Sequence, residues 1–187
     1  MYKVIFLLLV IYVCLFSNCK EGMENYEMNK HSSLLNIYGE PLHSCKTDSS
    51  NGSWDSKGYC SEMGGGVHQI CFKVTDETKD FSTDTGQSDW SKKRVDNNHC
   101  MCLGAFALYK AKGKGTGQEL QCESIMEHAL DESYVGNWGT WNGNEVDGQI
   151  VHGVNEIMDQ CYKGTSQQKE YLQNLYQNLY QNLTRDR

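Results

Sequence analysis

The sequence contains a single proline, Pro41, among its 187 residues. Tight turns must therefore rely on the 18 glycines and on asparagine, whose backbones tolerate positive φ angles. Basic residues are also few, because 17 lysines and arginines stand against 24 aspartates and glutamates. The resulting net charge of −7 argues against nucleic-acid binding, which requires a basic surface to contact phosphates.

Several motifs of known chemistry are missing as well. Two short basic clusters, Lys92 to Arg94 and Lys110 to Lys114, are expected to be solvated loops rather than a phosphate-binding patch. In the second cluster Lys114 is followed by Gly115 instead of Ser or Thr, which excludes a P-loop. No Cys-x-x-Cys pair is present, so neither the common zinc spacing nor the common redox motif occurs.

Long apolar runs are confined to the N-terminus. Lys3 precedes the 13 apolar residues from Val4 to Phe16, and Ser17-Asn18-Cys19 follows with small residues at the −3 and −1 positions. This layout predicts a secretory signal peptide over residues 1–19, because a membrane-spanning helix needs roughly 20 apolar residues. A retained anchor and a bacterial lipoprotein signal at Cys19 remain alternatives. We expect a protein secreted or held in the lumen of the secretory pathway, with no stable membrane span after cleavage.

Cysteine, by contrast, is abundant, with nine residues in the chain. Removal of the leader takes away two of them and one basic residue, which leaves an odd number of cysteines and a net charge of −8. In an exported chain of this size, structural disulfides are the default, and each stabilises by roughly 2–4 kcal/mol. Cys122 and Cys161 form a candidate pair, which leaves one free thiol among the other five. The disulfide candidates are Cys45, Cys60, Cys71, Cys100, Cys102, Cys122 and Cys161.

Two other uses of these cysteines remain open. Zinc accepts four soft ligands, and a free cysteine beside a histidine can be activated as a thiolate nucleophile. No recognised zinc spacing, nucleophile elbow or proximate base is visible in the sequence, so we expect no cofactor, with zinc as the alternative. The candidate metal or thiol site consists of His68, Cys71, His99, Cys100 and Cys102.

The pattern of apolar residues predicts an α+β fold with a short sheet and about three helices. We expect a linker over residues 20–35, a single disulfide-stabilised domain over residues 36–164 and a separate tail over residues 165–187. Strands are predicted at Val67–Val74 and Glu119–Cys122. Helices are predicted from a Thr75 cap to Phe81, at Cys100–Ala111, at Ile125–Leu130 after a Ser124 cap, and at Val151–Tyr162, with loops over residues 82–98 and 136–148.

The tail from Ser166 to Leu183 repeats the residues Gln-Asn-Leu-Tyr with a period of four. Since four is close to the 3.6 residues of a helical turn, the repeat predicts an amphipathic helix with one Leu/Tyr stripe. This stripe is expected to dock on the parent domain or on a second copy, to bind another protein, or to be a low-complexity expansion. The predicted contact residues are Tyr171, Leu172, Leu175, Tyr176, Leu179, Tyr180 and Leu183.

Two triplets match the acceptor pattern for N-glycosylation. They are Asn51-Gly52-Ser53, in a polar and turn-rich stretch, and Asn182-Leu183-Thr184, at the end of the tail. Both predict a glycoprotein if the chain is exported by a eukaryotic cell.

Five short motifs occur in order between Gly39 and about Leu130. They are Gly39-Glu40-Pro41-Leu42 with Cys45-Lys46-Thr47-Asp48, Asn51-Gly52-Ser53-Trp54 with Gly58-Tyr59-Cys60, Gly66-Val67-His68-Gln69-Ile70-Cys71, Val74-Thr75-Asp76-Glu77 with Phe81-Ser82, and His99-Cys100-Met101-Cys102-Leu103. In these motifs the chain resembles the domain of unknown function 2237, a mainly bacterial family. The resemblance covers about half of the chain.

The chain departs from the family pattern in three places. A doubled cysteine of the family is reduced to Cys60 alone, a proline-rich loop before the later Cys-x-Cys is missing, and a tryptophan of the family is His99 here. The resemblance implies a small α+β domain but no particular reaction.

The sequence as a whole predicts a secreted, non-enzymatic structural or protein-binding module. We expect it to be held by disulfides and to associate with a protein partner or with itself through its C-terminal helix. The alternative is a small thiol-dependent enzyme or a zinc-binding protein that uses the Cys/His cluster.

Overall fold

The structure is a computed structural model that describes residues 34–61, 68–115, 117, 119–136, 138–141 and 143–183. The predicted signal peptide and nearly all of the predicted linker lie outside these residues. One structural unit runs from Leu35 to Arg187.

A short two-stranded sheet lies at the centre of this unit. Strands β1 (Ile70–Lys73) and β2 (Asn98–Met101) pair antiparallel, and their register sets Cys71 opposite Cys100. Leu120 adds an isolated bridge to Phe72 on the free edge of β1. Because alternate residues of a strand face opposite sides, Cys71 and Phe72 point into different parts of the interior. Phe72 joins the main core, whereas Cys71 joins a separate group of cysteines.

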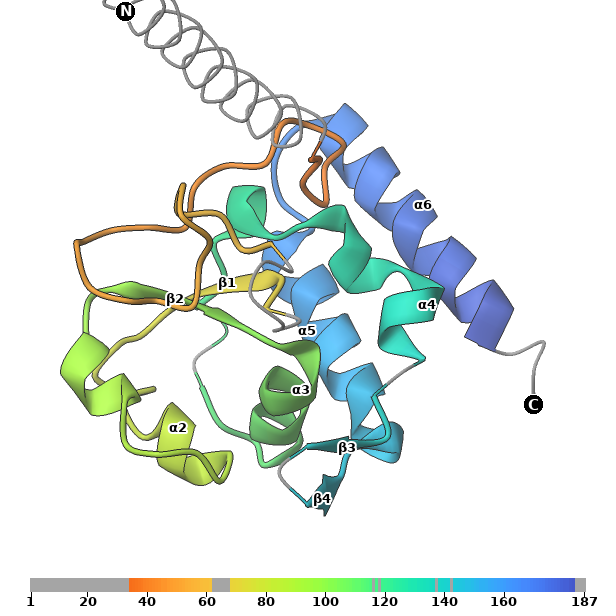
Figure 1. Ribbon diagram of the computed structural model, residues 1–187. Helices are drawn as coiled ribbons and strands as arrows, with labels where there is room; N and C mark the ends of the chain where they lie inside the picture. The colour runs from red at the N-terminus through yellow and green to blue at the C-terminus, as the bar shows by residue number, and fades with distance from the viewer. Residues whose placement is uncertain are drawn as a thin grey trace, which may run out of the picture. The chain divides into compact units, whose positions relative to one another are not determined.

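Helices α3 (Leu103–Ala111) and α5 (Ile150–Cys161) pack against each other beside the sheet (Figure 1). The first seven residues of α3 are all buried, as its apolar composition predicts. The two helices approach closely because Gly153 has no side chain. A Cβ atom at Gly153 would lie 3.0 Å from Leu103 and 3.1 Å from Ala107.

Short elements fill the rest of the unit. They are α2 (Phe81–Asp84), α4 (Glu132–Val135), a hairpin of β3 (Thr140–Trp141) and β4 (Asn144–Glu145), and four 3₁₀ turns at Ser91–Arg94, Cys122–Ser124, Glu127–Leu130 and Asp147–Gln149.

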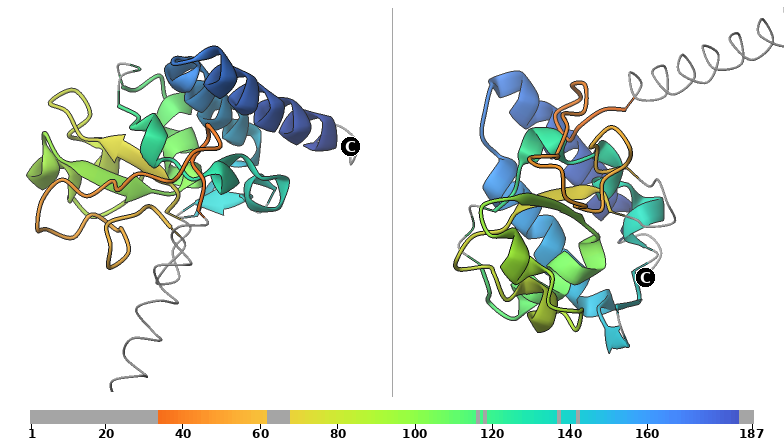
Figure 2. Two further views of the ribbon diagram at one scale, coloured as in Figure 1. Left: turned by 90° about the horizontal axis from the view of Figure 1, so that it is seen from above. Right: turned by 60° about the vertical axis from the view of Figure 1, so that its left-hand side comes forward.

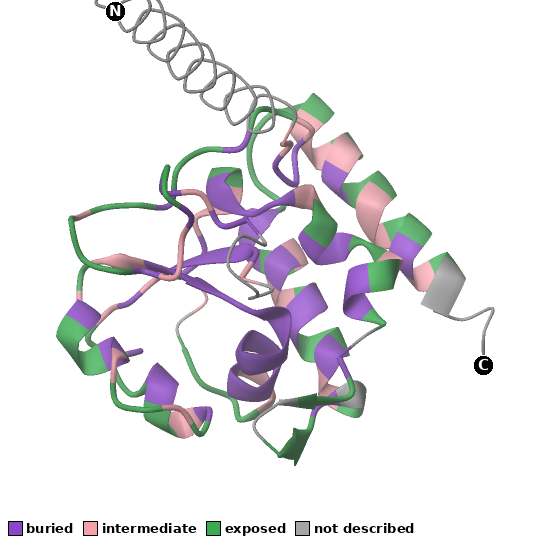
Figure 3. Ribbon diagram, in the orientation of Figure 1, coloured by how far each residue is buried: buried purple, intermediate pink, exposed green. Residues whose placement is uncertain are grey.

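Helix α6 (Ser166–Leu183) lies along the outside of the unit, next to α4 and α5 (Figures 1 and 2). Its inner side is buried and its outer side is exposed, as Figure 3 shows. Within the part of the chain that the structure describes, no helix combines the length and apolar character that crossing a membrane requires.

The predicted α+β fold class is confirmed, with five helices, α2 to α6, among the described residues. Several boundaries differ from the sequence prediction. Cys100 and Met101 belong to β2 instead of a helix, because backbone pairing with β1 overrides the helical preference of this apolar segment. Thr75 does not cap a helix; its backbone N–H donates to the Thr78 hydroxyl, and α2 begins only at Phe81.

The second half of the domain differs in similar ways. The predicted strand at Glu119–Cys122 is reduced to the single bridge of Leu120, and Cys122 begins a 3₁₀ turn. The predicted Ser124 cap is absent because the Ser124 hydroxyl donates to the Ser44 carbonyl, 80 residues away. A long-range hydrogen bond therefore replaces the local one that the sequence suggests.

Candidate functional site

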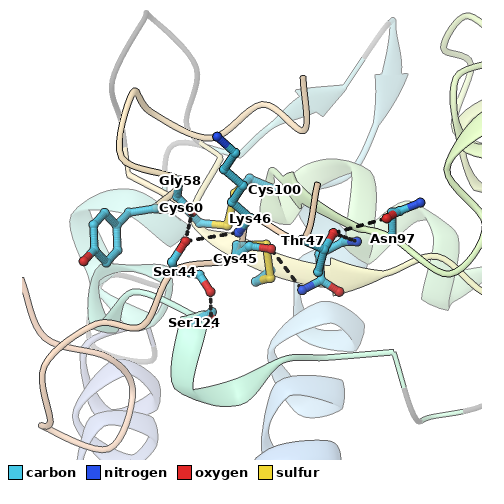
Figure 4. Close-up of a disulfide and its surroundings, with 12 residues drawn as sticks. Ser44, Cys45, Lys46, Thr47, Gly58, Cys60, Asn97, Cys100 and Ser124 are labelled. Carbon is cyan, nitrogen blue, oxygen red and sulfur yellow. Dashed lines mark hydrogen bonds between the residues drawn. A yellow bond between two sulfur atoms is a disulfide. The ribbon is translucent and has the colours of Figure 1, made fainter. Parts of the chain in front are cut away.

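Two disulfides attach the loop before β1 to both strands of the central sheet. Cys45 is bonded to Cys71 of β1 with an S–S distance of 1.97 Å, and Cys60 is bonded to Cys100 of β2 at 2.02 Å. All four cysteines are 0 % exposed and form their own buried cluster, against which Trp54 packs. We call these four residues the cysteine cluster; Figure 4 shows how close Cys45, Cys60 and Cys100 lie to one another.

Hydrogen bonds align the two parts of the loop that carry Cys45 and Cys60. The Cys45 N–H donates to the Gly58 carbonyl at 2.8 Å, and the Ser44 hydroxyl donates to the same carbonyl at 3.1 Å (Figure 4). The Asn98 side-chain amide of β2 donates to the Cys45 carbonyl at 3.0 Å. The cysteine cluster is therefore built by loop and sheet together, and no local sequence spacing encodes it.

A third disulfide lies apart from the cysteine cluster. Cys122, half-buried in a 3₁₀ turn, is bonded to Cys161 at the end of α5 with an S–S distance of 1.97 Å. Cys161 belongs to the main core, and Cys122 packs against it. This bond ties the last helix of the predicted domain to the segment beside β1.

Cys102 is the free cysteine of the described residues. Only 2 % of its surface is exposed, and it packs in the main core rather than in the cysteine cluster. Burial raises the pKa of the Cys102 thiol to about 12. Since the thiolate is the nucleophilic form, this thiol is poorly suited to catalysis at neutral pH.

His68 and His99 line one pocket of about 280 Å³ between β2, the start of α3 and the loop around Asn51. The structure thus brings together His68, His99, Cys100 and Cys102 of the predicted metal or thiol site, while Cys71 lies outside this pocket. The lining residues are Asn51, Ser53, His68, Gln87, Trp90, His99, Cys100, Met101, Cys102 and Ala105.

His99 is fixed by two neighbours. Its ring stacks on Trp90 with a centroid distance of 3.8 Å and an interplanar angle of 18°. Its Nε2 atom lies 3.2 Å from the Ser53 hydroxyl. Burial, helped by the positive charges of Arg94 and of protonated His68, lowers the pKa of His99 to about 3. Burial also lowers the pKa of His68, so both imidazoles are neutral at physiological pH.

The pair of Ser53 and His99 does not form a catalytic dyad of the usual kind. The Nδ1 atom of His99 is buried and has no hydrogen-bond partner in the described part of the chain. For Ser53 to be activated, Nε2 must accept its proton, and the Nδ1–H must then be held by an acceptor such as a carboxylate. That acceptor is missing here, so the tautomer with the proton on Nε2, donated to Ser53, is the less costly one.

Arg94 holds the loop that forms one wall of the pocket. Its guanidinium lies 5.2 Å above the Trp54 ring and donates to the Asn51 carbonyl at 3.1 Å. It also pairs with Asp48 at 3.5 Å. The prediction that the Lys92–Arg94 cluster is solvated is wrong for Arg94, because only 6 % of this residue is exposed.

Ser53 and Trp90 are site residues that the sequence did not reveal. Ser53 adopts a φ of 58°, which is unusual for a residue other than glycine, and its N–H donates to the Asn51 side chain. An Asn-Gly pair is a turn signal, but nothing in it predicts contact with a histidine 46 residues away.

Four of the five candidate metal ligands line one pocket, but in the described residues they form no group at the spacing of metal ligands. In the described segments, the metal-capable atoms that lie within 4.8 Å of one another are the sulfurs of Cys45, Cys60 and Cys71. Of the predicted set, Cys71 and Cys100 belong to the cysteine cluster. The two histidines and Cys102 line the pocket together with Cys100, which therefore borders both.

The predicted glycosylation residues lie in different surroundings. Asn51 is exposed at the rim of the pocket, with its side-chain oxygen accepting the Ser53 N–H. Asn182 lies in the last turn of α6, and its side chain is outside the described atoms.

The Leu/Tyr stripe of α6 faces the domain of its own chain. Leu172 is 0 % exposed and Leu179 is 1 % exposed, and both belong to the main core. The Tyr176 and Tyr180 hydroxyls lie 2.7 Å and 3.0 Å from the Asn155 side-chain oxygen of α5.

Further members of the stripe complete this contact. The Tyr171 hydroxyl donates to Glu127 at 2.7 Å, and its ring fills the space above Gly39, where a Cβ atom would lie 2.7 Å away. Leu175 is partly buried against the core, and the Leu183 side chain is outside the described atoms. The helix thus uses its apolar side within the chain, and its polar side faces outward.

Comparison with known proteins gives one match. Residues 35–136, just over half of the chain, match the sequence model of a family described as an uncharacterized protein conserved in bacteria, DUF2237. No curated protein and no solved structure matches the chain.

Proposed function

The chain belongs to the DUF2237 family, and we propose that this member is a secreted, non-enzymatic binding domain. In this proposal the disulfides fix the scaffold, and the pocket between Ser53, Trp90 and His99 holds a small, uncharged, hydrogen-bonding ligand. The observation that carries the proposal is a pair of neutral imidazoles, the buried His99 and the half-buried His68, that line one pocket beside an indole ring.

The disulfides support the location and the rigidity of the scaffold. Three bonds, at sequence separations of 26, 40 and 39, cross-link the described residues. Such bonds persist in oxidising compartments and are rare in the cytosol. They agree with the leader-like sequence at the N-terminus, which predicts export.

The chemistry of the pocket supports an uncharged ligand. Its polar lining consists of amides, a hydroxyl and imidazoles, and no carboxylate or ammonium group is among its lining residues. The nearby Arg94 guanidinium is engaged by Asp48 and by the carbonyls of Asn51 and Asn98. A charged ligand would lose its hydration without gaining an opposite charge, whereas a neutral one needs only hydrogen bonds.

Nuclear magnetic resonance of the histidine rings tests the ligand site. We expect the ring signals of His68 and His99 to shift during titration with small uncharged amides and monosaccharides. The exposed His43, His128 and His152 are internal controls whose signals should stay in place. The proposal is wrong if none of these probes moves His68 or His99 up to the millimolar range, or if these five of the six histidines respond equally.

Mass spectrometry tests the secreted, cross-linked form. Protein exported from the full chain should begin at Lys20 and gain about 6 Da on reduction, two hydrogens for each of three disulfides. Retention of the leader or a smaller mass change would contradict this part of the proposal.

A thiol-dependent enzyme is the competing function. The raised pKa and the burial of Cys102 weigh against it, because the free thiol is neither ionised nor accessible in the native fold. The unpartnered Nδ1 of His99 weighs against a serine nucleophile in the same pocket.

A further inference from the structure

We propose that the cysteine cluster is a zinc site when its two disulfides are reduced. The four sulfurs of Cys45, Cys60, Cys71 and Cys100 would then bind one Zn²⁺ and hold the loop on the sheet in place of the covalent bonds. This site shares Cys100 with the lining of the ligand pocket. It keeps Cys71 and Cys100 of the set that the sequence suggested, but Cys45 and Cys60 take the place of the two histidines and Cys102.

The positions of the sulfur atoms carry the proposal. The sulfurs of Cys45, Cys60 and Cys71 lie within 4.8 Å of one another, although Cys60 is not bonded to either of the other two. Cys100 lies outside this group of three, but its sulfur is bonded to that of Cys60, which makes it the fourth sulfur of the cluster. In a tetrahedral zinc site with Zn–S bonds of about 2.3 Å, neighbouring sulfurs lie about 3.8 Å apart. Three of the four sulfurs are thus already near the spacing of a zinc site, and the Cys100 sulfur must move inward to join them.

Within each bridge the sulfurs must move apart by less than about 2 Å to reach that spacing. The Cα–Cα distances of 5.7 Å and 5.3 Å leave room for rotation of the side chains without displacement of the backbone. The register of β1 and β2 keeps Cys71 and Cys100 side by side in either state.

The surroundings of the cluster also suit a structural metal. All four cysteines are 0 % exposed, so water would not compete for the metal, and four protein ligands close the site. The four residues come from the loop, from β1 and from β2. They are therefore far apart in the sequence and show no Cys-x-x-Cys spacing. Zinc would therefore be bound by tertiary structure and would stabilise that structure in turn.

The conversion balances in electrons and protons. Each disulfide takes up two electrons and two protons from a dithiol reductant, which is itself oxidised to a disulfide. The four thiols then lose four protons as their sulfurs bind Zn²⁺. Oxidation by a disulfide donor reverses the process and releases the metal.

The same arrangement separates the cluster from the other cysteines. Cys122 and Cys161 form their bond within the main core, and Cys102 also packs there rather than against the cluster. Removal of the Cys122–Cys161 pair should therefore leave the metal site intact.

Cobalt binding to the reduced protein tests the proposal. The exported chain is reduced with a phosphine in the absence of oxygen and titrated with Co²⁺, whose absorption reports tetrahedral thiolate coordination. We expect one Co²⁺ per chain with an intense visible spectrum, displacement by one Zn²⁺, and a higher melting temperature of the reduced protein with zinc.

Two double variants, each with one cysteine pair removed, provide the matched comparison. Cys60→Ala/Cys100→Ala should weaken Co²⁺ binding by more than about 100-fold, because loss of even an outer partner of a metal ligand costs 10- to 100-fold. Cys122→Ala/Cys161→Ala should keep one Co²⁺ per chain with an unchanged spectrum, although it has the same number of cysteines.

The proposal is overturned if the reduced wild-type protein unfolds without taking up the metal, or if its cobalt spectrum is not that of a tetrahedral thiolate site. Equal Co²⁺ binding by the two double variants would also overturn it, since the metal would then be bound by any available thiols and not by the cysteine cluster. None of these outcomes depends on whether the pocket binds a ligand, so failure here leaves the proposed function to its own tests.

Discussion

The ring of His99 stacks on the indole of Trp90 with a centroid distance of 3.8 Å and an angle of only 18° between the planes. This contact, together with the hydrogen bond to Ser53, places an imidazole where it is almost completely shielded from water. A buried histidine resists protonation, because the charged form loses its hydration.

The first prediction concerns the pH dependence of stability. His99 has a pKa of about 3 in the folded protein against about 6.5 when unfolded, so below pH 6.5 the unfolded chain binds the proton more readily. The free energy of unfolding should therefore fall by about 1.4 kcal/mol per pH unit as the pH drops from 6.5 towards 3. The contribution of neutral His99 to the free energy of unfolding is complete above pH 6.5 and is fully lost below about pH 3.

Urea unfolding of the wild type and of His99→Phe at pH 7, 6, 5 and 4 measures this effect. Phenylalanine keeps the stacking on Trp90 but cannot titrate, so the variant should gain roughly 3 kcal/mol relative to the wild type between pH 7 and pH 4. His152→Gln, on the exposed side of α5, is the control and should follow the wild type. If the free energy of unfolding falls with pH equally in His99→Phe and in the wild type, His99 is not buried in its neutral form.

The second prediction concerns the free thiol. Because Cys102 is buried and its pKa is raised to about 12, it should not react with a disulfide reagent at pH 8 in the native protein. One thiol per chain should react once the protein is unfolded in guanidinium. Cys161→Ala supplies the comparison, since it frees the half-buried Cys122, which should react at least about 100-fold faster than Cys102. A rapidly modified thiol in the native wild type would contradict the burial of Cys102.

The third prediction concerns the C-terminal helix. Leu172→Ala and Leu179→Ala should each lower the free energy of unfolding by about 2–4 kcal/mol, because each removes a fully buried side chain and leaves a cavity. Leu175→Ala, in the same stripe but only partly buried, should cost less than about 1.5 kcal/mol. Chemical denaturation of the three variants gives the comparison. Equal and small effects at all three sites would mean that α6 does not dock on its own domain.

The fourth prediction concerns a buried ion pair far from the pocket. The Lys110 ammonium lies 3.4 Å from Glu119, which is 0 % exposed, and 3.0 Å from Glu156. Lys110→Met should cost about 3–5 kcal/mol, because it leaves a buried carboxylate without its cation.

Lys114→Met is the matched control for this pair. Lys114 pairs with Asp84 at 3.6 Å with about half of its side chain exposed, so its loss should cost less than about 1 kcal/mol. Thermal unfolding at neutral pH separates the two variants. Similar melting temperatures for Lys110→Met and Lys114→Met would show that the pair of Lys110 and Glu119 is solvated.

Sequence patterns predicted those elements whose signal is local. The helix at Val151–Tyr162 is found as α5 (Ile150–Cys161), because its apolar residues recur at the helical period. The tail helix was predicted from its period of four in the same way and is found over Ser166–Leu183. The strand and helix around Cys100 could not be separated from sequence, because an apolar run fits both until a partner strand is known.

The candidate site was less predictable because its contacts span long stretches of chain. His68 and His99 were candidates by residue type, yet their shared pocket depends on the pairing of β1 with β2. Ser53 and Arg94 belong to the site only through tertiary contacts. Ser53 contacts His99, 46 residues away, and Arg94 contacts Asn51, 43 residues away. Such contacts have no period or spacing that a sequence pattern can display.

The sequence by itself determined the composition of this protein: an apolar leader, an odd number of cysteines in the remainder, an acidic balance and two amphipathic helices. Tertiary structure alone decided how Cys45, Cys60, Cys71 and Cys100 pair, that Cys102 stays free, and that the sulfurs of Cys45, Cys60 and Cys71 come together. The physical reason is that amphipathic patterns report which residues leave water, whereas the choice of partner depends on the register of a sheet and on the closure of loops.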